Sequence, residues 1–295
     1  MHFPRDKVVV SMKGGLGNQL FQYCTAKALS FRLEVDLILD LHWYLDNSQD
    51  HTKFILNRFR IDDETWIPPL KFSKNSRSFI YNIFNKISPL GFSLPVIRED
   101  KFKFRNEILN LKKPVFLDGY WQNENYFKNY RSEILNLISL EYNENKKFKY
   151  YFSKIHYSNS ICMHIRRGDY ISNSQAAKVH GIIEKEFYYQ SLNRLSNVVD
   201  NPVIFIFSDD LDWVKRNLSF DYETMIVDLN QPDRPELDLI LMSYCKNFII
   251  ANSSFSWWAA WLSIYQNKKI VAPKIWFLDN LLNMNMKLPK DWIRI

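Results

Sequence analysis

Residues 160–170 read Ser-Ile-Cys-Met-His-Ile-Arg-Arg-Gly-Asp-Tyr, an apolar run that ends in a histidine, two arginines, a glycine and an aspartate. An apolar run of this length before a turn is typical of a strand that is buried on both faces of a parallel sheet. Ligands of open parallel sheets bind beyond the carboxyl ends of the strands. We therefore expect His164, Arg166, Arg167 and Asp169 to project at that edge.

Two adjacent guanidiniums at a sheet edge indicate an anionic ligand, because arginine stays protonated under all physiological conditions. The stretch thus predicts a phosphate-bearing ligand. A solvated basic turn, or an internal pair between arginine and aspartate, would also account for these residues. The stretch by itself does not decide between the three interpretations.

The chain around this stretch alternates between apolar runs and helical patterns. Strands are predicted at 161–165, 203–207, 225–227, 248–251 and 270–272. Helices are predicted between them at 185–197, 209–217, 235–244 and 256–265. Regular alternation of this kind predicts a parallel sheet with helices on both faces.

The beginning of the chain repeats the scheme in another form. An apolar run at 8–12 leads into Lys-Gly-Gly-Leu-Gly-Asn-Gln at 13–19 and then into a helical pattern. Neither the third glycine of a dinucleotide fingerprint nor the Lys-Ser/Thr of a P-loop is present. The glycines, Gly15 and Gly17 among them, fit a tight strand-to-helix turn. They also fit a ligand site in which the amides of Asn18 and Gln19 face a ligand near the helix N-terminus.

Two α/β domains follow from this pattern, at residues 1–155 and 156–295, with a ligand cleft between them. In the first domain we expect a second strand at 35–40, loops and short helices at 41–113, a strand end at 115–121 and an amphipathic helix at 124–138. The polar segment 141–149 is the predicted linker.

Composition narrows the class of protein. Of the 295 residues, 46% are hydrophobic and 24% are charged, which is ordinary for a globular protein, and the net charge is +7. No block of like charges stands out, so nucleic acid is not an expected partner. The positive charge leaves peripheral contact with the inner membrane open, and the oligomeric state is open too.

The three cysteines lie in apolar segments without metal-ligand spacing, which predicts reduced, structural thiols. The sequence shows no signal peptide and no run of about 18 apolar residues that could span a membrane. We therefore expect a cytoplasmic protein, with the cytoplasmic face of the membrane as its place of peripheral contact.

Acidic residues follow the predicted strand at 203–207, in the order Ser-Asp-Asp-Leu-Asp. A helix with Ser208 as its N-cap and acids in the first turn explains them structurally. A divalent-metal site at Asp210 and Asp212 that holds a diphosphate is an alternative, because hard cations prefer carboxylate oxygens. A third interpretation places Asp209 at the base or ribose of a nucleotide, where it does not repel phosphate.

Small hydroxyl residues follow the predicted strand at 248–251. The segment reads Asn-Ser-Ser-Phe-Ser-Trp-Trp at 252–258. Several hydroxyls and N–H groups at a helix N-terminus predict a binding site for an anion. The tryptophans at 257, 258 and 261 fall on one helix face, so we expect them in the core.

Three of these stretches, at 14–22, 164–170 and 252–258, resemble the motifs of the α-1,2-fucosyltransferases of glycosyltransferase family 11. The acidic stretch at 208–210 fits as an intermediate motif. Order and approximate spacing match from about residue 8 to 273, and the absence of an anchor segment resembles the bacterial branch.

The resemblance implies a GT-B-like α/β fold of two Rossmann-like domains facing each other across a cleft. It further implies an inverting transfer of L-fucose from GDP-β-L-fucose to the 2-hydroxyl of a terminal galactose in an oligosaccharide or surface glycan. The second domain would bind the donor and the first the acceptor. No metal and no cofactor would take part, so the resemblance argues against a divalent-metal site at Asp210 and Asp212.

Residue roles follow from the resemblance. It places Arg167 on the diphosphate, with Arg166 and His164 supporting the donor or the cleft. It assigns phosphate contacts to the segment at 252–258, namely to Asn252, Ser253, Ser254 and Ser256. It assigns a wall near fucose and acceptor to the glycine loop, namely to Gly15, Gly17, Asn18 and Gln19. Asp209 would contact the nucleoside.

The general base remains open at this point. Asp169 is the only carboxylate of the central motif, and it fits either the base or a residue that orients the arginines. Two other functions also remain: a metal-dependent nucleotide-sugar transferase that uses Asp210 and Asp212, and a basic module that binds glycans or nucleic acid without catalysis.

Overall fold

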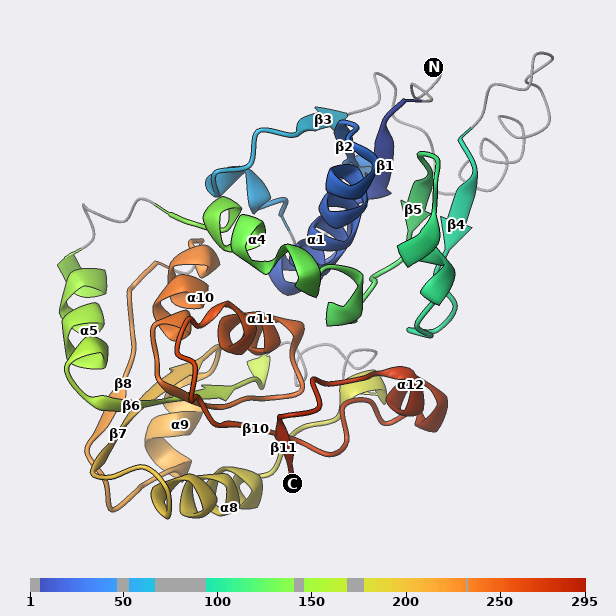
Figure 1. The fold of residues 1–295 in the computed structure, drawn as a ribbon. Helices are drawn as coiled ribbons and strands as arrows, with labels where there is room; N and C mark the ends of the chain where they lie inside the picture. The colour runs from blue at the N-terminus through green and yellow to red at the C-terminus, as the bar shows by residue number, and fades with distance from the viewer. Residues whose placement is uncertain (1–5, 47–52, 67–93, 141–145, 169–177, 232) are drawn as a thin grey trace. The chain divides into compact units, whose positions relative to one another are not determined.

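The computed structural model describes residues 6–46, 53–66, 94–140, 146–168, 178–231 and 233–295 (Figure 1). The chain divides into two compact units, Met1–Ile138 and Ser139–Ile295. Each unit is an α/β fold around one parallel sheet. The predicted boundary at residue 155 falls inside a helix of the second unit, so the structure divides the chain earlier.

The sheet of the first unit has the strand order β3-β2-β1-β5-β4, and all its pairings are parallel. Its strands are β1 (Val8–Ser11), β2 (Leu37–Asp40), β3 (Glu64–Trp66), β4 (Val96–Arg98) and β5 (Phe116–Asp118). The order reverses between β1 and β5, because the chain first extends the sheet on one side of β1 and then returns to the other.

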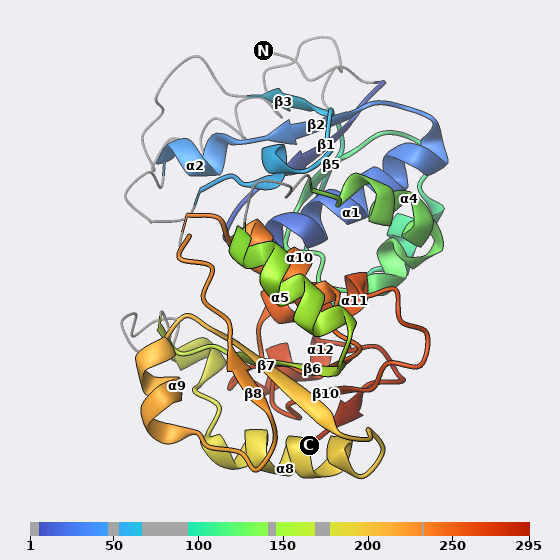
Figure 2. The same ribbon diagram turned by 90° about the vertical axis from the view of Figure 1, so that its left-hand side faces the viewer.

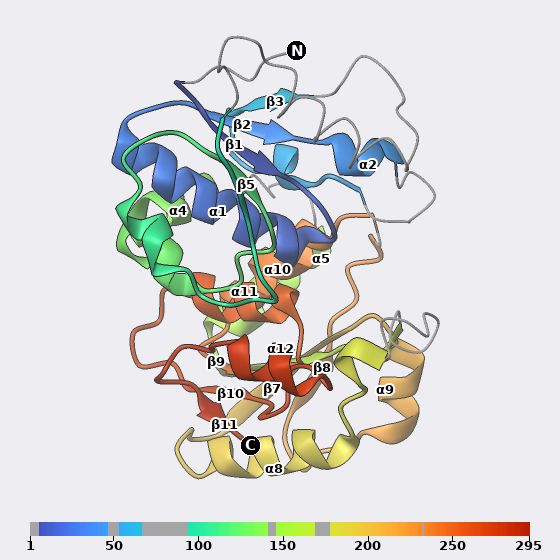
Figure 3. The same ribbon diagram turned by 90° about the vertical axis from the view of Figure 1, so that its right-hand side faces the viewer.

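Helix α1 (Leu16–Leu33) packs along this sheet and buries most of its length; Figure 3 shows it beside β1 and β5. Smaller elements connect the strands: α2 (His42–Asp46), η1 (Leu56–Arg58) and η2 (Asn106–Asn110). The prediction for 41–113 missed the strands β3 and β4. Both are three-residue edge strands with little apolar pattern.

The single helix predicted at 124–138 is wrong. The structure has η3 (Glu124–Tyr126), η4 (Lys128–Tyr130) and α4 (Arg131–Leu137) instead. The break falls at Phe127, whose φ of −138° is far from helical. Its ring is fully buried, with its centroid 6.0 Å from that of Phe21 on α1. Core packing of this ring thus overrides the helical pattern.

The second unit contains a six-stranded parallel sheet of order β11-β10-β9-β6-β7-β8. Its strands are β6 (Asn159–Ile165), β7 (Pro202–Ser208), β8 (Thr224–Ile226), β9 (Asn247–Ile249), β10 (Ile270–Ala272) and β11 (Ile293–Arg294). Read from β8, this is the 3-2-1-4-5-6 order of a Rossmann fold. The stretch that opened the sequence analysis forms the central strand β6, which is buried from Ser160 to Ile165.

Helices cover both faces of this sheet, as predicted (Figure 2). The helices of the unit are α5 (Lys146–His156), α8 (Lys185–Ser196), α9 (Leu211–Asn217), α10 (Pro235–Ser243), α11 (Ser254–Leu262) and α12 (Asn280–Asn285). Side chains of α8 and α9 share one core with alternate residues of β6 and β7. Helices α5, α10 and α11 pack together on the other side.

The structure also tests three further predictions, on the linker, the cysteines and the tryptophans. Part of the predicted linker at 141–149 is helical, since α5 begins at Lys146 and buries Phe148 and Ile155. All three cysteines are buried and form no disulfide. Trp257, Trp258 and Trp261 belong to the core, as expected.

In the part of the chain that the structure describes, no helix has the length and apolar character needed to cross a bilayer.

Candidate functional site

The arginine turn, Arg166–Gly168, follows β6 at the carboxyl edge of the second sheet. Strand order reverses between β6 and its neighbour β9, and such a switch point is where open α/β sheets bind ligands. Asp209, which follows β7, holds the turn. Its Oδ1 accepts from the backbone N–H of Arg167 over 2.8 Å, and its Oδ2 lies 3.2 Å from Nη1 of Arg166.

This geometry gives Asp209 a second role beside the predicted one. The carboxylate was predicted to contact the nucleoside of the donor. In the structure its two oxygens are engaged by the arginine turn. Asp209 therefore holds the arginine turn in place, through the backbone N–H of Arg167 and the guanidinium of Arg166.

Gly168 leaves little room beside that carboxylate for a side chain. A Cβ added to Gly168 would lie 3.0 Å from Oδ2 of Asp209 and 3.4 Å from its carbonyl oxygen. A larger residue would therefore push the arginine turn away from Asp209. The motif glycine thus belongs to the same arrangement as the two arginines.

The guanidinium of Arg167 is nearly buried. Its Cζ lies 4.0 Å from the centre of the Trp213 ring, a cation–π contact, and its side chain is 15% exposed. Its Nε is buried and has no hydrogen-bond partner among the described residues, and Oδ2 of Asp210 is 4.0 Å away. Leaving a buried charged donor without a hydrogen bond costs free energy, which favours an incoming anion as the missing acceptor.

The acidic run after β7 is a helix start. Asp210 is the N-cap of α9, and its Oδ1 accepts from the N–H of Trp213 over 3.0 Å. Ser208 was expected to cap this helix, but its Oγ instead accepts from the N–H of Asp210. Among the described residues, no group of three or more His, Cys, Asp and Glu side chains could hold a metal ion. One oxygen of the Asp210 carboxylate thus caps α9, and the other lies 4.0 Å from Nε of Arg167.

The segment after β9 differs from the predicted cluster of phosphate donors. Asn252 is buried, and its Nδ2 donates to the carbonyls of His180 and Trp276 over 2.7 and 3.3 Å. Ser256 is also buried, and its Oγ lies 3.3 Å from the carbonyls of Ala251 and Ser253. Both residues therefore hold the local backbone together and do not present donors to a ligand.

Ser253 and Ser254 occupy the start of α11. Ser253 is the N-cap, and its Oγ accepts from the N–H of Phe255 over 3.3 Å. Ser254 is the first helical residue and is partly exposed. The anion-binding capacity of this segment thus rests on Ser254 and on the N–H groups of the first turn.

His164 lies within β6 and does not project from the sheet edge as predicted. It is 4% exposed, and its ring centroid is 5.7 Å from that of Phe255 on α11. The residue thus links the central strand to the start of α11. Asp169, the candidate base, lies outside the described residues.

The glycine loop of the first unit follows β1 at the switch point beside β5. Gly14 has a φ of +75°, a conformation that favours glycine, and a Cβ there would lie 2.8 Å from Nδ2 of Asn18. Gly15 has an ordinary φ of −75° and open space around it. The residue that needs to be glycine is therefore Gly14, which was not among the predicted site residues. Gly17 lies buried in the first turn of α1.

Gln19 holds the loop and does not point at a ligand. Its Nε2 donates to the carbonyls of Gly14 and Lys53, and its Oε1 accepts from the N–H of Ile55. Gln22 makes a second clamp, with hydrogen bonds to both backbone groups of Lys13. Both amides are fully buried, so the two glutamines are positioning residues.

The loop after β5 contains residues that the sequence interpretation missed. Oδ1 of Asn18 accepts from Nε2 of Gln122 over 2.8 Å, which joins this loop to the glycine loop. Glu99 accepts from the N–H groups of Tyr120 and Trp121, and Trp121 has a φ of +57°. The available signal in the sequence was Gly-Tyr-Trp-Gln at the end of the predicted strand. The positive φ of Trp121 in the structure marks strained backbone, which is common in functional sites.

Asp238 in the first turn of α10 is a further residue with perturbed chemistry. Burial raises its pKa to about 7, and the nearby carboxylates of Asp228 and Glu236 add to this effect. Glu236 itself is fully buried and is paired with Arg234. Carboxyl groups with such raised pKa values occur preferentially at functional sites, although the sequence pattern indicated only a helix start.

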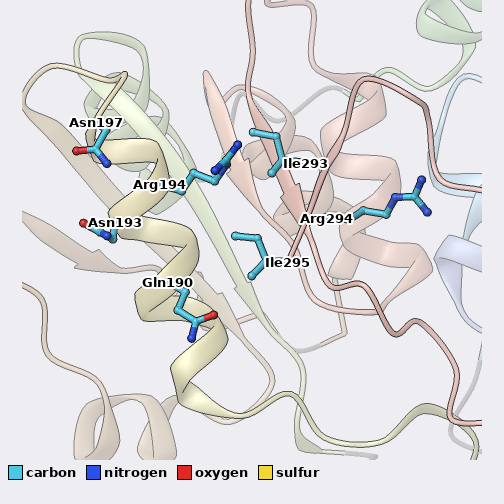
Figure 4. A pocket seen from close by; sticks show the side chains of 7 residues that line it. All are labelled: Gln190, Asn193, Arg194, Asn197, Ile293, Arg294 and Ile295. Carbon is cyan, nitrogen blue, oxygen red and sulfur yellow. The ribbon is translucent and has the colours of Figure 1, made fainter.

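A surface cavity of about 440 Å³ lies elsewhere in the second unit (Figure 4). It is lined by Gln190, Asn193, Arg194, Asn197, Ile293, Arg294 and Ile295. The guanidiniums of Arg194 and Arg294 point in different directions in Figure 4 and do not converge on one position. None of these residues belongs to the loops that follow β6, β7 and β9, so the cavity is separate from the arginine turn.

Two Rossmann-like units, each built around one parallel sheet, are the α/β architecture of the GT-B-like glycosyltransferases. The profile of glycosyl transferase family 11 matches residues 5–295, and the chain belongs to this family. The expectations for fold and family are thus confirmed.

Similar proteins support this assignment. An alpha-1,2-colitosyltransferase of Escherichia coli is 37% identical over 98% of this chain and 98% of its own length. The O-antigen biosynthesis glycosyltransferase WbnK of Escherichia coli is 32% identical over 96% of this chain and 99% of its own length. The crystal structure of POFUT1 in complex with GDP-fucose shares the fold at a TM-score of 0.51 and 12% identity, over 92% of this chain and 99% of that one.

Proposed function

We propose that the chain is an inverting, metal-independent α-1,2-fucosyltransferase. It moves L-fucose from GDP-β-L-fucose to the 2-hydroxyl of a terminal galactose. The observation that carries the proposal is Arg167 at the carboxyl edge of β6, a nearly buried cation whose Nε has no hydrogen-bond partner in the part of the chain that the structure describes. A diphosphate is the anion that this position suits, since open α/β sheets bind nucleotides at such a switch point.

In this proposal the arginine turn stabilises the leaving group. Departure of GDP places negative charge on the β-phosphate, and a donor that is fixed in advance in a nearly buried position lowers the barrier most effectively. Arg167 supplies that donor, held by Asp209 and by the ring of Trp213. The first turn of α11 with Ser254 adds N–H groups toward the same phosphates. The acceptor hydroxyl attacks from the opposite face of the sugar, which inverts the anomeric centre.

A second donor is favoured by one comparison. The 37% identical relative is named a colitosyltransferase, and colitose is L-fucose without the 3-hydroxyl. The transferred sugar of this chain is therefore either L-fucose or its 3-deoxy form. The linkage to O2 of the acceptor is common to both candidates.

The acceptor in this proposal is a galactoside of a surface glycan. The WbnK relative is named for O-antigen biosynthesis, which supports a bacterial polysaccharide precursor as the natural acceptor. Three cysteines without disulfides agree with a reducing, cytoplasmic setting. Nucleic acid has no part in the proposal.

The test is product analysis with both donors. The purified chain is incubated with GDP-L-fucose or GDP-L-colitose and with lactose or N-acetyllactosamine, and the linkage is determined by NMR. Transfer of fucose to O2 of galactose supports the proposal. Transfer from GDP-colitose alone would replace the donor, and transfer to another hydroxyl would contradict the linkage.

The same assay separates the alternatives. Loss of transfer in EDTA, with recovery on adding Mg²⁺ or Mn²⁺, would favour the metal-dependent transferase with Asp210 and Asp212. A binding module without catalysis would form no product. Its affinity for a polyanion would also fall steeply with salt.

A further inference from the structure

Six aliphatic side chains are exposed together on the second unit, and we name them the α12 face. They are Val179 (38% exposed), Ile182 (37%), Ile275 (58%), Leu278 (53%), Leu281 (46%) and Met284 (68%). They come from two segments that are far apart in the sequence, at 178–182 and at 275–284. Figure 1 shows α12 in red beside the yellow-coloured segment at 178–182.

Backbone contacts join the two segments. The N–H of Leu278 donates to the carbonyl of Val179 over 2.9 Å. Gly181 has a φ of +72°, and a Cβ on it would lie 3.0 Å from Cδ2 of Leu278. The side chain of Leu278 therefore lies over Gly181, and the two segments form one surface.

Buried residues hold the α12 face in place. Trp276 and Phe277 are each 3% exposed, and Oδ1 of Asn283 accepts from both of their N–H groups. Leu281 and Met284 stand three residues apart on α12 and so share one side of it. The rings of Trp276 and Phe277 fill the space beneath the α12 face, so the aliphatic side chains of this face point to solvent from a fixed backbone.

Lysines border this apolar surface. Lys178 precedes Val179, Lys274 precedes Ile275, and Nζ of Lys287 donates to the carbonyl of Met284 over 2.6 Å. All three lysines are exposed. The neighbouring carboxylate of Asp279 caps α12 through the N–H of Leu282, so its charge is directed to the helix start.

This composition favours a lipid surface over a protein partner. The centres of protein interfaces are enriched in aromatic residues and arginine and depleted in lysine. Surfaces that lie on membranes combine exposed apolar side chains, aromatic or aliphatic, with lysine and arginine, because the apolar groups enter the acyl boundary and the cations meet anionic headgroups. The exposed side chains of the α12 face are aliphatic, and the three cations named above are lysines.

The α12 face is joined to the same sheet edge as the arginine turn. The segment 275–284 follows the carboxyl end of β10, and Asn252, which follows β9, donates to the carbonyls of His180 and Trp276. Asn252 thus ties both segments of the face to the start of α11. A lipid surface at this face would lie on the side of the unit to which its proposed donor site belongs.

We propose that the α12 face docks the enzyme on an anionic phospholipid bilayer. Ile275, Leu278, Leu281 and Met284 enter the boundary between headgroups and acyl chains, and the three lysines contact lipid phosphates. The proposal goes beyond the transfer reaction and is independent of the identity of the donor.

Sedimentation with vesicles tests it. The purified chain is mixed, without sugar nucleotide, with vesicles of phosphatidylethanolamine and phosphatidylglycerol in equal parts, and with vesicles of phosphatidylcholine alone. We expect binding to the anionic vesicles that weakens as salt rises. The double variant Leu281→Ser/Met284→Ser should bind about ten-fold less tightly, because it removes apolar surface that enters the bilayer. The variant Lys274→Gln/Lys287→Gln should lose most of the salt dependence.

The matched control is Val198→Ser/Ile264→Ser, which removes two aliphatic residues that are 64% and 71% exposed outside the α12 face. It should bind vesicles like the wild type. All variants should keep the wild-type unfolding temperature and the wild-type rate with a free oligosaccharide acceptor. Equal vesicle binding by the wild type and the Leu281→Ser/Met284→Ser variant would overturn the proposal. A wild-type dimer that this variant converts to a monomer would overturn it too, because a second copy would then cover the face.

Discussion

The carboxylate of Asp209 accepts the backbone N–H of Arg167 over 2.8 Å and lies 3.2 Å from the guanidinium of Arg166. One acid after β7 thus holds the backbone of one arginine and the guanidinium of the other after β6. Removing it should loosen both arginines without removing either. We expect Asp209→Ala to lower kcat/KM about 10–100-fold, as for other residues that support a binding group.

Asp209→Asn serves as the comparison variant. It keeps an acceptor for the N–H of Arg167 but loses the charge opposite Arg166. Its kcat/KM should lie between those of the wild type and Asp209→Ala. Equal rates for all three proteins would show that the contact has no positioning role.

Arg167 itself should matter more. Arg167→Ala removes the proposed contact to the β-phosphate, and we expect kcat to fall about 10²–10³-fold, the usual effect of losing one donor to the charge that develops in the transition state. Arg167→Lys keeps the charge but not the planar stacking on Trp213, so it should be only partly active. Steady-state rates with GDP-fucose measure both. Near-wild-type rates for Arg167→Ala, in a chain with unchanged circular dichroism, would exclude this residue from the diphosphate site.

Adjacent glycines of the first unit give a matched pair. Gly14→Ala places a Cβ at positive φ and against Asn18, so it should lower the unfolding temperature by several degrees, from a cost of about 1–2 kcal/mol. Gly15→Ala meets open space at an ordinary φ and should leave the unfolding temperature within about 1–2 °C of the wild type. Thermal unfolding of both variants checks this. Equal shifts would contradict the conformation of the loop.

Asp238 predicts a dependence of stability on pH. Its pKa is raised from an ordinary 3.8 to about 7, so the folded chain keeps a proton that the unfolded chain loses as pH rises through this interval. The free energy of unfolding therefore falls between these two pH values. Asp238→Asn removes the titration. It should unfold like the wild type near pH 4 and about 2–4 °C higher near pH 8. An unfolding temperature that is lower than that of the wild type at the higher pH would contradict the raised pKa of Asp238.

The apolar runs were sufficient to locate the arginine turn. A run such as 161–165 predicts a central strand, and a central parallel strand places the next residues at the ligand edge. The contact of Asp209 with the arginine turn could not be predicted from the sequence, because it depends on strand order. Only the parallel pairing of Ile165 with Ser208 brings Asp209 beside Arg167, and a single-sequence pattern does not show which strands are neighbours.

Side-chain direction was the other limit. Gln19, Asn252 and Ser256 are polar residues in motif segments, and the sequence interpretation turned them all toward a ligand. In the structure each bonds backbone groups around it, and for Gln19 and Asn252 these include groups far away in the sequence, at Lys53 and at His180. Buried backbone groups need partners as much as ligands do, and motif polarity does not distinguish the two uses.

The clamps on the glycine loop have a consequence for binding energetics. Gln19 and Tyr44 both donate to the carbonyl of Gly14, and Gln22 bonds both backbone groups of Lys13. The loop is therefore fixed before any ligand arrives, and a ligand that contacts it gains affinity without first ordering the backbone. A ligand that reaches this loop would therefore be selected by its fit to a preformed surface.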